Sequence, residues 1–81
     1  MSNQRFEYRM CQAQFGRVTF VNGEWAGTLP PDHEKAIETC PWIWEYLNQA
    51  GAQGWQMSGA LMMSESNNAQ ILYLMRALNE Q

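Results

Sequence analysis

The chain has 81 residues, a length that fits one small domain with one hydrophobic core over residues 1–81. Hydrophobic residues make up 46% of the chain and include four Trp, three Tyr and three Phe, so we expect a folded protein rather than a disordered one. The net charge of -3 argues against a protein that binds nucleic acid or anionic lipid by bulk electrostatic attraction.

Three strands are predicted in the first third of the chain. Residues 5–13 alternate between apolar and mostly polar side chains, which is the period of a half-buried strand. Two β-favouring runs, predicted as strands over 17–21 and 24–28, are joined by Asn22-Gly23. Asn-Gly is typical of a hairpin, because both central residues of a type I′ turn need positive φ. We therefore expect a tight hairpin at this point.

The connection over 28–41 contains all three prolines, the only histidine and the only lysine. Its apolar content is low, so we interpret it as a surface segment. Proline suits the first position of a helix, and a short helical turn that begins at Pro31 and ends at Pro41 is one option for it. A lid over a binding site and a plain loop are the other two.

The principal helix is predicted over 42–52. Its apolar residues recur at the helical spacing i, i+3, i+4 and i+7. They are Ile43, Tyr46, Leu47 and Ala50. Gly51 and Gly54 offer the left-handed conformation in which helices often stop.

Two further strands are predicted over 55–64 and 70–77, and the second is apolar on both faces, as expected of a central strand. The order β-β-β-α-β-β predicts an α+β fold, in which one helix packs on one face of an antiparallel sheet of about five strands. The side chains that we expect to be largely buried are Phe6, Tyr8, Val18, Phe20, Ile43, Leu47, Trp55, Leu61 and Tyr73.

One short helix cannot cover both faces of such a sheet. Either the strands curl into a partial barrel or the uncovered face meets another subunit, and for a chain this small we favour the subunit. We therefore predict a homo-oligomer, most simply a dimer.

The stretch 47–55 reads Leu-Asn-Gln-Ala-Gly-Ala-Gln-Gly-Trp. Together with Phe6-Glu7-Tyr8-Arg9 and with 73–76, it resembles a family of short bacterial and phage domains of unknown function. The hallmark of that family is Leu-Asn-x-x-Gly-x-x-Gly-Trp after a first strand that contains Tyr. The resemblance implies a small α+β fold and contributes no known activity. Where the family continues with Glu-Leu-Val after the Trp, this chain has Gln-Met-Ser over 56–58.

The motif also has a physical interpretation, in which it serves the structure. Asn48 lies near the predicted helix end, where its side chain can satisfy free backbone groups, and the two glycines permit the reversal. Trp55 would then pin the following strand beneath the helix.

The membrane and the secretory pathway are disfavoured by two observations. The longest apolar run, 59–63, is far shorter than the roughly 20 residues that cross a bilayer. No apolar segment of the kind found in secretory signals follows the first charge, at Arg5. We expect a cytoplasmic protein without a membrane partner, in which Cys11 and Cys40 are reduced and packed as small hydrophobic residues.

The chain carries few groups that suit catalysis. One histidine and two scattered cysteines give no spacing that resembles a zinc site. A nucleophile and base could come only from His33 with Cys40 or Cys11, and no orienting group is visible beside them. The glycines form no phosphate-binding loop. We predict that the protein is not an enzyme and has no metal or cofactor.

Aromatic residues are the remaining functional candidates. Ile43 and Leu47 define the buried side of the helix, which leaves Trp44 on a different side, and Trp is enriched at binding hot spots. The candidate binding residues are Trp25, Trp42 and Trp44.

The leading hypothesis is a non-catalytic, self-associating protein-interaction module that also recognises a protein partner. The alternative is a small-molecule binding or sequestering protein with an aromatic pocket at a subunit boundary, roofed by the connection over 28–41. The sequence names neither the partner nor the ligand.

Overall fold

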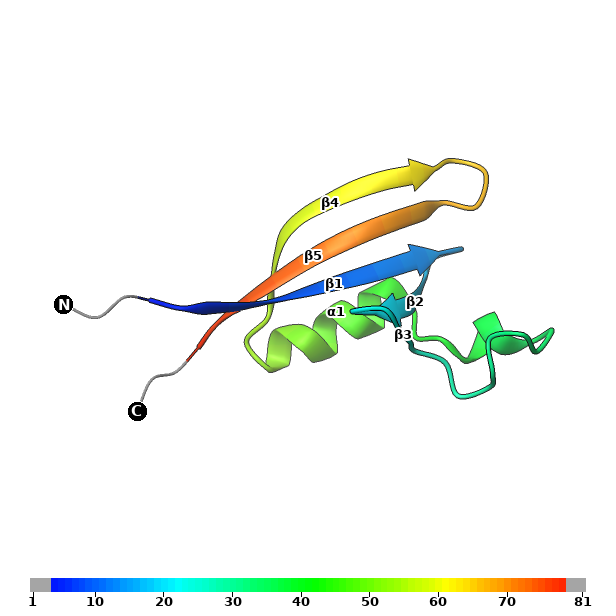
Figure 1. The fold of residues 1–81 in the computed structure, drawn as a ribbon, viewed down its shortest axis with the longest axis horizontal. Helices are drawn as coiled ribbons and strands as arrows, with labels where there is room; N and C mark the ends of the chain where they lie inside the picture. The colour runs from blue at the N-terminus through cyan, green and yellow to red at the C-terminus, as the bar shows by residue number, and fades with distance from the viewer. Residues whose placement is uncertain (1–3, 79–81) are drawn as a thin grey trace.

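The computed structural model describes residues 4–78 as five strands, one α-helix and one short 3-10 helix. The strands are β1 (Phe6–Gln14), β2 (Arg17–Val21), β3 (Glu24–Trp25), β4 (Gln56–Ser64) and β5 (Ala69–Ala77). The helices are η1 (Ala36–Thr39), which is the 3-10 turn, and α1 (Ile43–Ala52). All five strands join one antiparallel sheet in the order β3-β2-β1-β5-β4, with α1 against one face (Figure 1). The predicted α+β fold and element order are confirmed.

Two tight turns with left-handed residues shape the first half of the sheet. Asn22 and Gly23 have φ angles of 51° and 84°, as predicted for the hairpin between β2 and β3. Phe15 and Gly16 have φ angles of 53° and 77° and form a similar turn between β1 and β2. The backbone N–H of Phe15 donates to the carbonyl of Asn67 at 2.9 Å. This hydrogen bond joins the turn after β1 to the loop between β4 and β5.

Strand β3 ends at Trp25, earlier than the predicted boundary of 28. A side chain at Gly27 would meet Thr39 Oγ1 at 2.5 Å, so the backbone passes very close to η1 at this glycine. Thr39 Oγ1 also accepts a hydrogen bond from the backbone N–H of Thr28 at 3.0 Å. The chain therefore leaves the sheet because it turns back toward η1.

The connection over 28–41 is a mostly exposed loop that contains one 3-10 turn. The turn begins at Ala36 and not at Pro31. Arg17 on β2 donates from Nη1 to the carbonyl of Cys40 at 2.9 Å, which holds the end of the loop beside the sheet.

Helix α1 supplies the apolar side chains that close one face of the sheet. Its predicted buried positions all face the strands, so the helical spacing in the sequence identified the correct side. The core cluster consists of Cys11, Val18, Ala50, Trp55, Leu72 and Leu74, with Val21, Ile43, Tyr46 and Leu47 packed against it.

Trp55, which follows the end of α1, is buried as predicted. The guanidinium groups of Arg9 and Arg76 lie over its ring, at 4.2 Å and 4.6 Å from the ring centroid. Arg9 Nη1 donates to the hydroxyl of Tyr46 at 2.7 Å, and Arg76 forms an ion pair with Glu7. Charged side chains of β1 and β5 thus form part of the packing around this tryptophan.

Three of the residues predicted to be buried are exposed, and the prediction was wrong for them: Tyr8, Leu61 and Tyr73. All three lie on the face of the sheet that α1 does not cover, as the strand pairing below shows. Phe6, Phe20, Ile43 and Leu47 are half-buried, whereas Val18 and Trp55 are buried.

Candidate interaction surface

The face of the sheet opposite α1 is formed by alternate residues of β1, β5 and β4. Directly paired residues on neighbouring strands point to the same face. Met10 is paired with Tyr73, which is paired in turn with Gly59 on β4. We call this surface the open face, and it comprises Phe6, Tyr8, Met10, Gln12, Gly59, Leu61, Ile71, Tyr73 and Met75. None of these side chains carries a charge.

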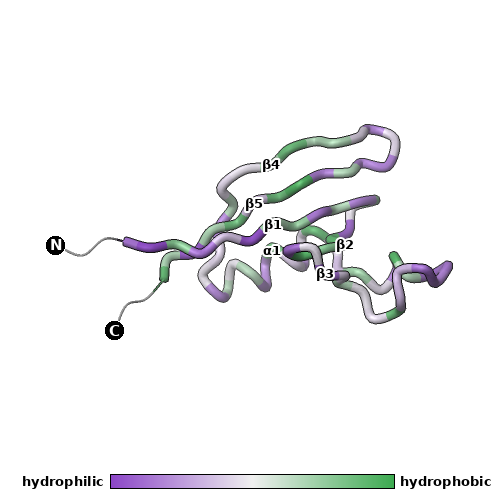
Figure 2. Tube along the Cα trace, in the orientation of Figure 1, coloured by the Kyte–Doolittle hydropathy of each residue, from purple (hydrophilic) through white to green (hydrophobic). Residues whose placement is uncertain are grey.

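Strand β4 is the edge of the sheet, and all of its residues except Ser64 are exposed. Its large side chains Met57, Leu61, Met62 and Met63 are between 48% and 58% exposed. Met57 and Met62 pair with Leu74 and Gln70, so they point to the α1 side of the sheet. They remain exposed because α1 lies beside β2, away from the β4 edge (Figure 1). Figure 2 shows the hydrophobic stretch of β4 at the outer edge of the sheet.

The sequence of β4, Gln-Met-Ser-Gly-Ala-Leu-Met-Met-Ser, contains no proline and no charged residue. Natural edge strands are commonly protected by such residues, because an unpaired strand can add another strand. Irregular pairing limits the regular part of β4, since its register against β5 shifts between Met57 and Gly59 and between Met62 and Ser64. The regular part is therefore the short stretch 59–62.

The opposite edge of the sheet, β3, is short, carries a charged residue and is covered by the chain that follows it. Strand β3 has two residues, one of which is Glu24. The ring of Trp25 packs edge-on against Phe20, with 5.4 Å between ring centroids, and its Nε1 donates to the carbonyl of Leu29 at 2.7 Å. The chain after β3 is therefore held against this edge.

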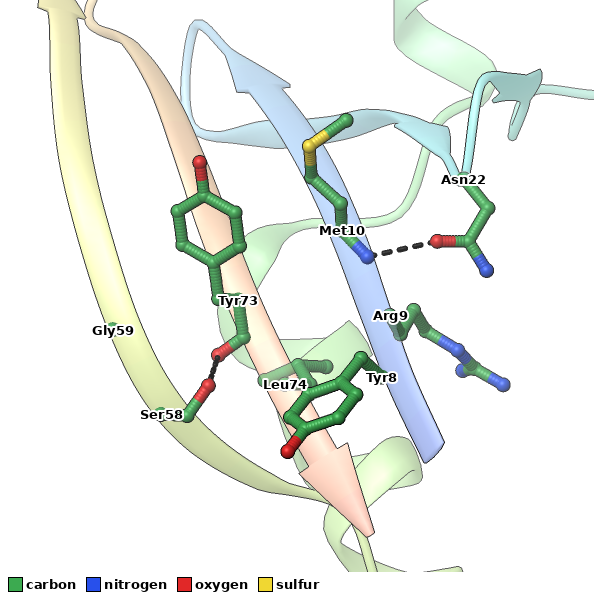
Figure 3. Close-up of a pocket in the computed structure, with 8 residues that line it drawn as sticks. All are labelled: Tyr8, Arg9, Met10, Asn22, Ser58, Gly59, Tyr73 and Leu74. Atoms are coloured by element: carbon green, nitrogen blue, oxygen red, sulfur yellow. Dashed lines mark hydrogen bonds between the residues drawn. The ribbon is translucent and has the colours of Figure 1, made fainter. Parts of the chain in front are cut away.

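A pocket of about 430 Å³ is hollowed into the open face beside β4 (Figure 3). Gly59 forms part of its lining, and a Cβ built there would lie 3.8 Å from Tyr73 Cδ2, an ordinary contact distance. Ser58 Oγ already donates to the Tyr73 carbonyl at 3.2 Å. The pocket is lined by Tyr8, Arg9, Met10, Asn22, Ser58, Gly59, Tyr73 and Leu74.

The polar side chain on the far side of this pocket is also engaged. Asn22 Oδ1 accepts a hydrogen bond from the backbone N–H of Met10 at 2.8 Å. Arg9 contributes to the lining, but its guanidinium is directed to Tyr46 and Trp55 on the other side of the sheet. The surface presented by Tyr8, Met10 and Tyr73 is consequently suited to an apolar group.

A second pocket, of about 320 Å³, lies where the connection over 28–41 meets β2 and β3. Phe20 and Trp25 supply its aromatic wall, and Pro31, His33 and Ile37 come from the connection. This arrangement corresponds to the aromatic pocket roofed by 28–41 that the sequence suggested as an alternative.

None of the three candidate tryptophans belongs to the open face as defined above or lines its pocket. Trp25 points to the same side of the sheet, because it pairs with Phe20, which pairs with Gln12. Trp44 is 63% exposed on α1. Trp42 is 41% exposed, and the guanidinium of Arg17 lies 3.8 Å from the centroid of its ring. Trp25 is half-buried rather than exposed, because it packs against Phe20 and is hydrogen-bonded to the loop. Trp44 is thus the most exposed of these candidates.

Sequence reasoning missed the residues that form the open face, above all Tyr8, Gly59 and Tyr73. One signal pointed to such a face, since the last strand is apolar on both sides while a single helix covers one side. The assignment of individual residues failed because the alternation does not say which side the helix takes.

Both cysteines that the sequence offers as nucleophiles are buried. His33 is exposed, and its Nδ1 accepts a hydrogen bond from the backbone N–H of Lys35 at 3.0 Å. Burial raises the pKa of the thiols of Cys11 and Cys40, whereas a nucleophilic cysteine needs a lowered pKa.

Among residues 4–78, no three His, Cys, Asp or Glu side chains are grouped as metal ligands would be. No helix in that range has the length and hydropathy of a transmembrane segment.

Comparison with protein-family models, with curated proteins and with solved structures gave no match to this chain. The resemblance based on the Leu-Asn-x-x-Gly-x-x-Gly-Trp stretch therefore stays a prediction.

Proposed function

We propose that the chain is a non-catalytic, self-associating protein-interaction module whose contact surface is β4 together with the open face. The observation that carries this proposal is the exposure of β4, whose large apolar side chains are uncovered on both sides of the sheet. Contiguous exposed apolar surface of this kind marks interaction sites in soluble proteins.

A second copy of the chain is the simplest occupant of this surface. A standard interface buries about 800 Å² on each partner. The side chains of β4 and the adjoining open face, which includes Tyr8 and Tyr73, form one continuous apolar surface on which such an area could be buried. We therefore propose a homodimer, which leaves other surfaces, including exposed Trp44, for a different protein partner.

Sedimentation velocity across the micromolar range tests this proposal. We expect the parent protein to be dimeric and Met62→Lys to be largely monomeric at the same concentration, because the lysine places a charge on the apolar edge. Gln49→Lys, an exposed position on α1, is the matched control and should associate like the parent. A parent protein that stays monomeric throughout this range would overturn the proposal.

The non-catalytic assignment rests on the raised pKa of both thiols and on the exposed position of His33. We also propose a cytoplasmic location, with which two buried free cysteines are compatible.

The alternative of a small-molecule binding protein is favoured by the roofed pocket between Phe20, Trp25 and the connection over 28–41. Its volume lies at the lower end of the range typical of ligand pockets. Native mass spectrometry of the purified protein distinguishes the two functions. A bound small molecule that is lost in Trp25→Ala would favour the binder, and a ligand-free dimer would favour the interaction module.

A further inference from the structure

We infer that β4 pairs antiparallel with β4 of a second copy, so that Ala60 lies opposite Ala60 and Leu61 of each copy covers Gly59 of the other. The two sheets then form one continuous sheet across a twofold axis. This inference rests on the proposed self-association and specifies its geometry.

The sheet offers only one edge of sufficient length within residues 4–78. Strand β4 has nine residues, whereas β3 has two and is held against the loop that follows it. A head-to-tail arrangement would need both edges, but a twofold arrangement uses the same edge twice. Because β4 carries no charged residue, its pairing with an identical strand brings no like charges together.

The irregularities of β4 restrict where the axis can lie. The stretch from Gly59 to Met62 pairs regularly with β5, and the register shifts on either side of it. A twofold axis perpendicular to the sheet keeps both open faces on one side. Residues that lie directly opposite one another must then point to the same face. Either Ala60 or Leu61 can therefore lie opposite its own copy at the axis. Ala60 cannot lie opposite Leu61, because these two neighbours point to different faces.

Side-chain size decides between these two registers. With Ala60 at the axis, Leu61 of one copy lies directly opposite Gly59 of the other, on the open face. A large side chain beside a glycine on the neighbouring strand covers the space that the glycine leaves. With Leu61 at the axis, Gly59 would instead lie opposite Met63, within the irregular pairing between Met62 and Ser64.

The pocket on the open face gives the leucine a place to pack. Gly59 forms one wall of that pocket, and Tyr8, Met10 and Tyr73 form an apolar surface beyond it. Leu61 is 52% exposed on the sheet edge, so it has apolar surface available for a second copy. Pairing of the two β4 edges thus places one Leu61 side chain in each of the two pockets. The same contact explains why residue 59 is a glycine, why a pocket lies beside it and why Leu61 is exposed in the single chain.

Cysteine cross-linking tests the register. Residues directly opposite in an antiparallel pair have Cα atoms about 4.5–5.5 Å apart, within the range of a disulfide. Ala60→Cys should therefore form an intermolecular disulfide under mild oxidation at least about tenfold faster than Met62→Cys. Two Met62 residues would be offset by four positions, or about 13 Å along the strand. The parent protein, with Cys11 and Cys40 buried, gives the background rate.

Filling the pocket from within tests the role of Leu61. A Cβ at Gly59 meets nothing closer than Tyr73 Cδ2 at 3.8 Å, so Gly59→Leu should fold, and its free energy of unfolding should match that of the parent when both are measured below the dimer dissociation constant. It should raise the dimer dissociation constant by about tenfold or more, because its own side chain occupies the place of Leu61 from the second copy. If Gly59→Leu fails to fold, the cross-linking comparison still decides the matter.

The outcomes separate this inference from the proposed function. A parent protein that is monomeric overturns both. A dimer in which Ala60→Cys cross-links no faster than Met62→Cys, or in which a folded Gly59→Leu associates like the parent, overturns the edge pairing and leaves self-association standing.

Discussion

The two faces of β1 and β5 are built from alternate residues of the same strands, yet they differ in chemistry. The face toward α1 contains Arg9, Arg76 and Glu7, whose charged groups are stacked on Trp55 or paired with one another. The open face contains no charge and exposes Tyr8 and Leu61. The comparison shows that the charged side of a strand can be the packed side, because long arginine side chains cover an aromatic ring while their charges remain satisfied.

The largest expected effect contrasts two neighbouring residues on β5. Leu74 is 1% exposed in the core, and Tyr73 is 39% exposed on the open face. Leu74→Ala should lower the free energy of unfolding by about 2–5 kcal/mol. Tyr73→Ala should lower it by about 1 kcal/mol. Urea unfolding at a protein concentration below the dimer dissociation constant measures both, and equal losses would contradict the assignment of the two faces.

A second contrast concerns two tryptophans. Trp25→Ala removes a ring packed on Phe20 and a hydrogen bond to Leu29, so it should cost about 1–3 kcal/mol in unfolding free energy. Trp44→Ala should change that free energy by no more than about 0.5 kcal/mol, because its ring is exposed on α1.

The Trp44→Ala variant also tests where the two copies contact one another. If the second copy binds β4, Trp44→Ala should leave the dimer dissociation constant unchanged. Sedimentation of this variant as a monomer would move the self-contact to α1.

Alkaline pH should destabilise the folded protein. Burial raises the pKa of the Cys11 and Cys40 thiols and of the Tyr46 hydroxyl above their ordinary values. Above about pH 9 the unfolded chain therefore loses protons that the folded protein retains, and the unfolding free energy falls as pH rises. Urea unfolding at pH 7 and at higher pH measures this slope. Cys11→Ala should make the slope shallower, and an unchanged slope would mean that Cys11 does not contribute to it.

The smallest expected effect is at the ion pair between Glu7 and Arg76, whose side chains are partly exposed. Glu7→Gln should lower the unfolding free energy by less than about 1 kcal/mol, because such pairs are weak near solvent. The difference from the parent should shrink further in 1 M salt, where the Debye length is about 3 Å. A loss that does not change with salt would indicate packing of the side chain rather than charge.

Much of the local structure was predictable because it depends on short-range rules. The Asn22-Gly23 hairpin and the apolar stripe of α1 follow from backbone preferences and helical period. Trp55 was also placed correctly, since it follows two glycines at the helix end.

The interior position of β5 was predicted from its two apolar faces, but which strands lie beside it was not predictable in this way. Strand β5 inserts between β1 and β4, which makes β4 the edge, and no periodicity within 55–64 contains that information. The alternation in β1 suggested that Tyr8 is buried, because the opposite side carries Arg9 and looks polar. The stacking of that arginine on Trp55 is a contact between distant segments and reversed the assignment.

The hydrogen bond from Phe15 to Asn67 bears on how fast two copies can associate. It ties the outer end of the β4–β5 hairpin to the turn after β1, so the edge strand is held in place before a second copy arrives. Binding then avoids most of the entropy cost of ordering a flexible segment. The association rate should therefore be that of two rigid bodies finding the correct orientation, about 10⁵–10⁷ M⁻¹s⁻¹, without a slow conformational step.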